Sequence, residues 1–151
     1  MDKKIFEEIC SSLPKQSVLK TESFRGQNTI YIDQKYLIKV MKILKESFGF
    51  KYLTDLTALD YYPNFPRFVV VYHLWCHERR DLLRIKVPIT VDPPVVDSVV
   101  SIWSTANWHE RECYDMFGIK FKGHPDLRRI LLWEGFDGHP LRKDYPVEGK
   151  E

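Results

Sequence analysis

Apolar positions recur at helical spacing in two segments near the start of the chain. In residues 3–13 the apolar side chains fall on one face of a helix, which Pro14 would end. In residues 33–49 apolar side chains recur every three or four positions. Asp33 can cap the start of this second helix, and Gly49 stands where a helix-ending glycine commonly occurs. The pattern therefore predicts two amphipathic helices.

Between and after these helices the pattern is typical of strands. Residues 29–32 and 50–59 each predict a single strand, since both are rich in β-branched, aromatic and alternating apolar positions. Residues 67–76 and 82–91 predict an antiparallel hairpin around the polar turn at 77–81. Helices alternating with such strands predict an α+β fold, a single domain with helices packed on a mostly antiparallel sheet.

Helical spacing returns in the second half of the chain. Residues 96–103 predict a helix that Asp97 could cap. Asn107 with Glu110 three residues later fits a capping pattern, so a further helix is predicted to begin there. It would end at Gly118.

Regular periodicity is lost in the last part of the chain. The predicted organisation is an α+β domain over residues 1–118, followed by an extended, charged and aromatic docking tail over residues 119–151. The tail has too little patterned apolar surface for a core of its own, so it is either disordered or ordered along another surface. Arg, Trp and Tyr are favoured in protein interfaces, and prolines lower the entropy lost on docking. A protein interface is the preferred interpretation.

Composition and charge restrict the function classes. The 151 residues carry a net charge of +2, which does not favour a nucleic-acid partner or a membrane surface, and acids interrupt the basic run of the tail. The three cysteines are widely spaced, so reduced thiols are expected. We expect no signal segment and no spanning helix, and any membrane contact to come through a partner.

One cluster could carry metal chemistry. His109, Glu112 and Cys113 would share a helix face, but further ligands would have to come from elsewhere. His73 and His77 could converge on one face of a strand, a weaker metal candidate. No nucleophile elbow and no phosphate-binding glycine loop is present in the sequence. A small metal-dependent hydrolase remains an alternative, and the preferred prediction has no catalytic, cofactor or metal residues.

Three consecutive blocks in the last third carry a resemblance to a known family. Residues 110–119 (ERECYDMFGI) resemble the E-R-E-x-[YF]-D-[ML]-[FL]-G-[IV] signature of the thirty-kilodalton subunit of respiratory complex I, NADH:quinone oxidoreductase. Residues 122–131 (KGHPDLRRIL) and 138–146 (GHPLRKDYP) resemble the two blocks that follow in that family. Three blocks in the right order make chance a poor explanation.

The resemblance implies a partner-interface set within these blocks. It comprises Glu110, Arg111, Glu112, Asp115, Gly118, His124, Pro125, Arg128, Arg129, Pro140, Leu141, Arg142, Lys143, Asp144 and Tyr145. The helix carboxylates are expected to pair with arginines of the tail or of the partner, and the basic residues of the tail to bind carboxylates of the large partner subunit. Cys113 stands where the family usually has an aliphatic residue, and we expect it to pack as one.

The resemblance also implies a place in a larger assembly. The chain would be a hetero-oligomeric subunit of the peripheral arm of a proton-translocating complex, with a structural and assembly role. It would contact the large hydrogenase-like quinone-site subunit and the subunit with the terminal iron–sulfur cluster. FMN, iron–sulfur clusters, NADH and quinone would belong to the complex and not to this chain. The expected location is the cytoplasmic face of the bacterial inner membrane, or the matrix side in an organelle. Equivalent subunits of membrane-bound hydrogenases or F420-dependent dehydrogenases are the alternative.

Overall fold

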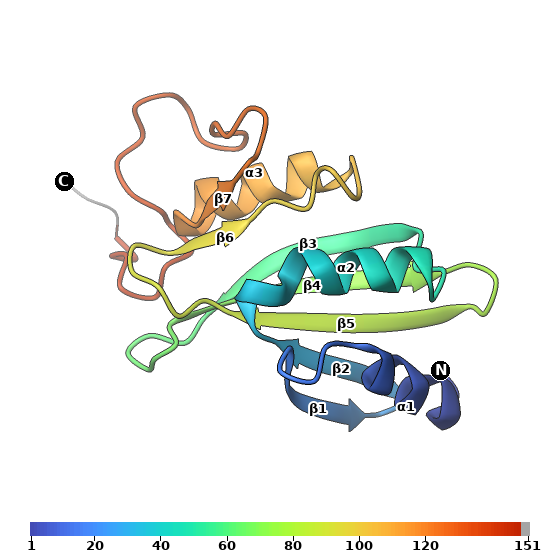
Figure 1. Cartoon of the computed structure of the whole chain (residues 1–151). Helices are drawn as coiled ribbons and strands as arrows, with labels where there is room; N and C mark the ends of the chain where they lie inside the picture. Colours follow the sequence, from blue (N-terminus) through green and yellow to red (C-terminus); the bar gives the residue numbers. More distant parts are fainter. Residues whose placement is uncertain (149–151) are drawn as a thin grey trace.

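The computed structural model of the chain describes residues 1–148, and its helices and strands alternate along the chain (Figure 1). The helical elements are α1 (Lys3–Ser12), η1 (Gln34–Tyr36, a 3-10 turn), α2 (Leu37–Glu46) and α3 (Ala106–Phe117). The strands are β1 (Val18–Phe24), β2 (Gln27–Ile32), β3 (Tyr52–Asp60), β4 (Phe68–Cys76), β5 (Asp81–Pro88), β6 (Val95–Asp97) and β7 (Lys120–Lys122). This arrangement confirms the predicted α+β class.

Five strands form the main sheet in the order β1-β2-β5-β4-β3. All neighbours are antiparallel except β2 and β5, which pair in parallel from Asn28↔Leu83 to Tyr31↔Lys86. The parallel pair is possible because the long excursion through α2, β3 and β4 separates β2 from β5 in the sequence. The predicted antiparallel hairpin is confirmed as β4 and β5, with Cys76 opposite Asp81 next to the turn.

One hydrophobic core joins the helices to this sheet. It includes Ile9 of α1, Met41 of α2, Tyr72 of β4 and Phe117 of α3. Strand β4 has no exposed residue, because its side chains are covered on both faces of the sheet. The ring of Phe68 at the start of β4 meets the ring of Phe117 edge-on, with 6.4 Å between centroids. The C-terminal end of α3 therefore packs where β4 begins, and the rest of the helix lies along β3.

The first strand, β1, has no counterpart in the predicted elements. Its residues 18–24 are mostly exposed and show no alternation of apolar and polar positions. It is an edge strand that pairs only with β2, so backbone hydrogen bonds hold it rather than burial of one face. Hydrophobic periodicity gives no signal in such a strand.

The helix predicted over residues 96–103 is wrong. The structure places strand β6 (Val95–Asp97) there, paired in parallel with β7, and turns follow it. Asp97 consequently caps no helix. Val96, Val99 and Trp103 are buried, but they are buried from a strand and a turn, not from one helical face. Apolar residues do recur every three or four positions here, but they belong to a short strand and the turns after it, so this spacing does not by itself establish a helix.

The predicted start of α3 is also wrong, whereas its predicted end is confirmed. The helix begins at Ala106 after Thr105, so Asn107 lies inside it and caps nothing. Gly118 ends the helix in the left-handed conformation with φ 72°, as expected for a glycine at this position.

A candidate partner-docking site

The C-terminal segment, defined as residues 123–148, contains no helix or strand, yet it follows a defined path beside α3 (Figure 1). In the figure it is the orange-to-red chain that loops away from β7 and returns toward the end of the sheet. Its backbone is therefore held by contacts other than those of regular secondary structure. Carboxylates and helix-end carbonyls supply most of them.

Asp115 of α3 is the first carboxylate that holds the segment. Its Oδ2 atom accepts hydrogen bonds from the backbone N–H groups of three consecutive residues, at 3.1, 2.7 and 2.9 Å, namely Ile130, Leu131 and Leu132. Its Oδ1 atom accepts from Arg129 Nη1 at 2.8 Å. The side chain of Asp115 is fully buried. Burial by itself would raise the pKa of this carboxyl, but the three N–H groups and the Arg129 cation outweigh it and lower the pKa.

Two arginines complete this attachment. Besides its ion pair with Asp115, Arg129 donates to the carbonyl oxygens of Phe136 at 3.1 Å and Gly138 at 2.9 Å. Arg111 of α3 donates to the carbonyls of Arg128 and Arg129 at 3.1 and 2.9 Å. Both guanidinium groups are thus engaged within the chain.

The C-terminal end of α3 binds a later part of the segment. The last carbonyl groups of a helix lack partners within it. Here His139 Nδ1 lies 2.9 Å from the carbonyl oxygen of Asp115, the backbone N–H of Leu141 donates to Met116, and Arg142 Nε donates to Phe117. The Arg142 pKa is lowered, first by burial and then by the neighbouring cation of Arg67. Residues 139–142 therefore act as the cap of the helix.

A second carboxylate, Asp60 at the end of β3, joins the segment to the main sheet. Arg67 donates to both oxygens of Asp60 at 2.9 Å and to both oxygens of Asp144 at 3.0 and 2.6 Å. Asp60 also accepts from the backbone N–H groups of Tyr62 at 2.9 Å and Lys143 at 2.8 Å. One guanidinium thus bridges the sheet and the C-terminal segment.

Glu110 has a different environment from the other carboxylates of α3. It is fully buried, and it accepts hydrogen bonds from Ser98 Oγ at 2.6 Å and from the backbone N–H of Val99 at 2.7 Å. His124 Nε2 lies 4.0 Å from it and contacts the carbonyl oxygen of Asn107 at 3.1 Å. Burial raises the pKa of Glu110 to about 7, although its two hydrogen bonds act in the opposite direction. Within residues 1–148 Glu110 thus binds Ser98 and Val99, and the carboxyl orders the turn after β6.

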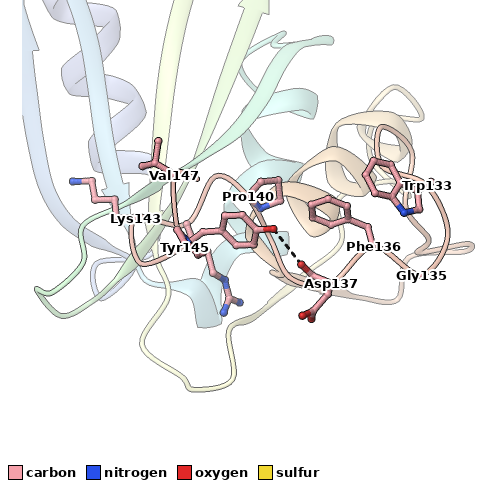
Figure 2. A pocket seen from close by; sticks show the side chains of 10 residues that line it. Trp133, Gly135, Phe136, Asp137, Pro140, Lys143, Tyr145 and Val147 are labelled. Carbon is pink, nitrogen blue, oxygen red and sulfur yellow. Dashed lines mark hydrogen bonds between the residues drawn. The ribbon is translucent and has the colours of Figure 1, made fainter. Parts of the chain in front are cut away.

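The outer surface of the segment carries large apolar side chains that are exposed to solvent. Trp133 is 70% exposed and Leu131 is 62% exposed, although both follow the backbone held by Asp115. Figure 2 shows Trp133, Phe136 and Tyr145 in a row, with the Tyr145 hydroxyl directed at the carbonyl oxygen of Asp137. The centroids of neighbouring rings are 4.8 and 6.3 Å apart. The row lines an open groove of about 780 Å³ that reaches Lys143 and residues 146–147.

The structure brings most of the proposed interface residues together, but it divides them into two groups. Asp115, Arg129 and Arg142 make hydrogen bonds within the chain, and binding of these two arginines to partner carboxylates stays a prediction. Glu112 and Lys143 are exposed. Arg128 is exposed as well and pairs with Asp126 at 2.8 Å. The exposed members remain available to a partner.

Sequence patterns missed Asp60, Arg67 and Ser98. Asp60 and Arg67 lie far upstream of the signature blocks, and no local spacing connects them to Asp144. Ser98 lies in the segment predicted as a helix, where a serine hydroxyl would not meet Glu110. Only the fold brings these residues to the site.

The histidine and cysteine cluster has a packing role in the structure. Cys113 is buried, its Sγ lies 4.0 Å from the carbonyl oxygen of Leu56, and burial raises the pKa of its thiol well above the usual value. His109 faces Asp55, with 3.8 Å between Nδ1 and Oδ1. His73 accepts from Arg84 Nε at 2.9 Å. Within residues 1–148 no group of three or more His, Cys, Asp or Glu side chains is placed to hold a metal ion.

None of the helices within residues 1–148 combines the length and the apolar character that crossing a bilayer requires.

Comparisons with known proteins agree with the signature. The family model of the respiratory-chain NADH dehydrogenase 30 Kd subunit matches residues 30–151. The chain is 47% identical over 135 residues to the C-type subunit of the NADH-quinone oxidoreductase of Geotalea uraniireducens, covering 89% of this chain and 82% of that protein. It is 48% identical over 126 residues to a C-type subunit of the same enzyme from Rhizobium etli, covering 82% and 67%.

Solved structures support the same assignment. The trypsin-resistant fragment (1-134) of Nqo5 is 31% identical, with a TM-score of 0.70 over 83% of this chain and 98% of that one. The archaeal membrane-bound sulfane sulfur reductase complex contains a chain with a TM-score of 0.80 over 96% of this chain and 85% of its own, and at 24% identity this likeness shows the fold alone. The family match, the relatives and the fold agree: the chain belongs to the 30-kDa subunit family of respiratory-chain NADH dehydrogenase and is the C-type subunit of an NADH:quinone oxidoreductase.

Proposed function

We propose that this subunit has a structural and assembly role in the peripheral arm of the complex. Its C-terminal segment would dock on the large hydrogenase-like quinone-site subunit, beside the subunit with the terminal iron–sulfur cluster. The single observation that carries this proposal is the combination of a fixed backbone with exposed apolar side chains. Leu131 and Trp133 stay exposed, while Asp115 holds the backbone of Leu131 and of Leu132, which precedes Trp133. Exposed apolar patches of this kind are typical of protein interfaces.

The redox cofactors of the complex would be held by partner subunits. The three thiols of this chain lie apart, in α1, at the end of β4 and in α3, and the latter two are buried. Iron–sulfur clusters require several cysteines converging on one site. The proposed contribution to electron transfer from NADH to quinone is therefore indirect: a rigid binding surface that keeps the neighbouring subunits in place. Membrane association would come through those subunits, at the cytoplasmic face of a bacterial inner membrane.

The test is a pull-down of the tagged chain from detergent-solubilised native membranes, followed by mass spectrometry. We expect the flavin-bearing and cluster-bearing NADH dehydrogenase subunits and the large quinone-site subunit in the eluate. Recovery of hydrogenase or F420-dependent dehydrogenase subunits would assign the chain to one of those sister complexes instead. A chain recovered alone would contradict the docking role.

A second arm examines the exposed apolar surface directly. Trp133→Ala should reduce recovery of the partner subunits without lowering the stability of the chain, since most of the indole is solvent-exposed. Phe24→Ala is a matched control, because Phe24 is equally exposed at the β1–β2 turn, far along the chain from the C-terminal segment. Equal recovery of the partner subunits with both variants would contradict a docking role of the segment.

A further inference from the structure

The groove along the C-terminal segment is open, yet its walls are fixed in place. On one side Asp115 binds three successive N–H groups immediately before Trp133. On the other side Asp60 binds the backbone N–H of Lys143, and Arg67 binds the carboxylate of Asp144. An occupant would thus meet a surface that is already ordered, so little conformational entropy is lost from this side on binding.

The shape and chemistry of the walls point to a chain in extended conformation. The groove is lined by a row of aromatic rings, Trp133, Phe136 and Tyr145, with Pro140 beside it (Figure 2), and Pro146 lines it as well. Grooves lined by aromatic rings bind extended, proline-rich segments, because such segments are already stiff and present alternating side chains. The groove is open to solvent and not enclosed, which suits a segment of a partner chain better than a small molecule.

A lysine side chain lies at one end of the groove. In Figure 2 Lys143 lies at the end of the aromatic row opposite Trp133. Its backbone N–H donates to Asp60, and its side chain is exposed to solvent. The neighbouring guanidinium of Arg142 is already used by the carbonyl of Phe117. Lys143 is therefore an exposed cation that can pair with an incoming carboxylate at this end of the groove.

We propose that this groove binds an extended segment of a partner subunit. Apolar or proline residues of that segment would lie over the aromatic row, and an aspartate or glutamate would face Lys143. The inference rests on the proposed docking function and specifies which kind of partner segment occupies the groove.

Photo-cross-linking in the assembled complex identifies the occupant. The chain carries p-benzoylphenylalanine in place of Trp133 in one variant and in place of the fully exposed Val147 in another, with Phe24 as the control position. After irradiation of native membranes, we expect both groove positions to link to one short stretch of one partner subunit. That stretch should contain an acidic residue and no helix. Cross-links to a helix face, to a stretch without acids, or to no protein at all would overturn the proposal.

Charge variants test the carboxylate contact in the same complex. Lys143→Glu should weaken association with the partner by about tenfold, whereas Lys143→Arg should preserve it. Lys122→Glu is the control, because Lys122 is an exposed lysine on β7 that lines no part of the groove. The melting temperature of each isolated variant should match that of the parent chain. An unchanged affinity for Lys143→Glu, or an equal loss for Lys122→Glu, would exclude the proposed contact.

The two proposals fail in different ways. If the chain is recovered with NADH dehydrogenase subunits but the groove positions do not cross-link to an extended acidic stretch, the docking function stands and the groove proposal is wrong. If no partner subunit is recovered at all, the docking function itself is wrong.

Discussion

Asp115 and Asp60 both hold the C-terminal segment in place through hydrogen bonds to its backbone. Each is a buried carboxylate that binds one arginine and also backbone N–H groups: three of the C-terminal segment for Asp115, and those of Tyr62 and Lys143 for Asp60. A buried charge is costly unless it is fully hydrogen-bonded, and a backbone without regular structure needs partners for its N–H groups. Each carboxylate meets both requirements at once. Single residues of α3 and β3 therefore determine the path of a segment that has no secondary structure of its own.

Replacing Asp115 by asparagine should loosen the segment. The amide removes the charge that pairs with Arg129 and one of the two oxygens that accept hydrogen bonds, so we expect a loss of about 3 kcal/mol in the free energy of unfolding. Urea denaturation measures the loss, and hydrogen exchange at residues 130–132 should accelerate. Asp126→Asn is the matched control, since Asp126 is exposed and makes only a surface pair with Arg128. Similar losses in both variants would contradict the role given to Asp115.

Glu110 should make folding stability depend on pH in the opposite sense to an ordinary ion-paired carboxylate. Its pKa is about 7 in the folded chain, above the 4.5 of an unperturbed glutamate, so the folded state binds the proton more tightly. The stabilising protonation is complete below pH 4.5 and is lost as the pH rises toward 7. Compared with Glu110→Gln, the parent chain should lose up to about 3 kcal/mol between pH 4.5 and 8.

Urea denaturation of both proteins at several pH values measures this difference. Glu112→Gln, at an exposed position of the same helix, should leave the pH profile of the parent unchanged. Parallel profiles for the parent and Glu110→Gln would mean that Glu110 stays ionised in the folded chain.

Helix α3 and its C-terminal cap form the element on which the docking site depends. The helix end requires a left-handed residue at position 118, and the space beside that residue is filled by His139 and Arg142. A Cβ at Gly118 would lie 2.5 Å from His139 Cδ2 and 2.6 Å from Arg142 Nη2. Glycine is needed here both for its backbone conformation and for the close approach of the segment.

Gly118→Ala should therefore cost more than backbone strain alone. Gly123→Ala provides the comparison, because Gly123 also has a positive φ, 85°, but a Cβ there would meet nothing within 4 Å. We expect about 1 kcal/mol for Gly123→Ala and about 2–4 kcal/mol for Gly118→Ala, since the latter also displaces the helix cap. Denaturation curves give both values. Equal costs would show that residues 139–142 move aside freely.

At the scale of the whole molecule, Arg67 couples the main sheet to the C-terminal segment. Its guanidinium is the only group of residues 1–148 that pairs with both Asp60 and Asp144. The two carboxylates are 84 positions apart in numbering, so the contact exists only in the folded chain. The predicted division into residues 1–118 and a docking tail from 119 remains a prediction. Strand β7 nevertheless pairs with β6, and the segment beyond it is tied to α3 and β3.

Arg67→Lys should release the end of the segment while the sheet stays folded. A lysine ammonium cannot pair with two carboxylates in bidentate fashion, so we expect a loss of about 1–3 kcal/mol and faster proteolysis after residue 140. Limited digestion with chymotrypsin, followed by mass spectrometry, locates the cleavage. Arg128→Lys, at an exposed surface pair, should digest like the parent chain. Unchanged digestion of Arg67→Lys would show that Asp144 is not needed to hold the segment.

Sequence patterns predict the elements that bury one regular face, namely α1, α2 and the β4–β5 hairpin, and also the end of α3 at Gly118. They also identify the family, since the signature blocks are contiguous in the chain. Tertiary structure alone decided the rest. Edge strand β1 has no apolar alternation, strand β6 is only three residues long, and Asp115, Asp60 and Glu110 bind groups that are distant in sequence. Local sequence patterns indicate which side chains are buried locally, whereas the hydrogen bonds of these carboxylates form only when folding brings distant residues together.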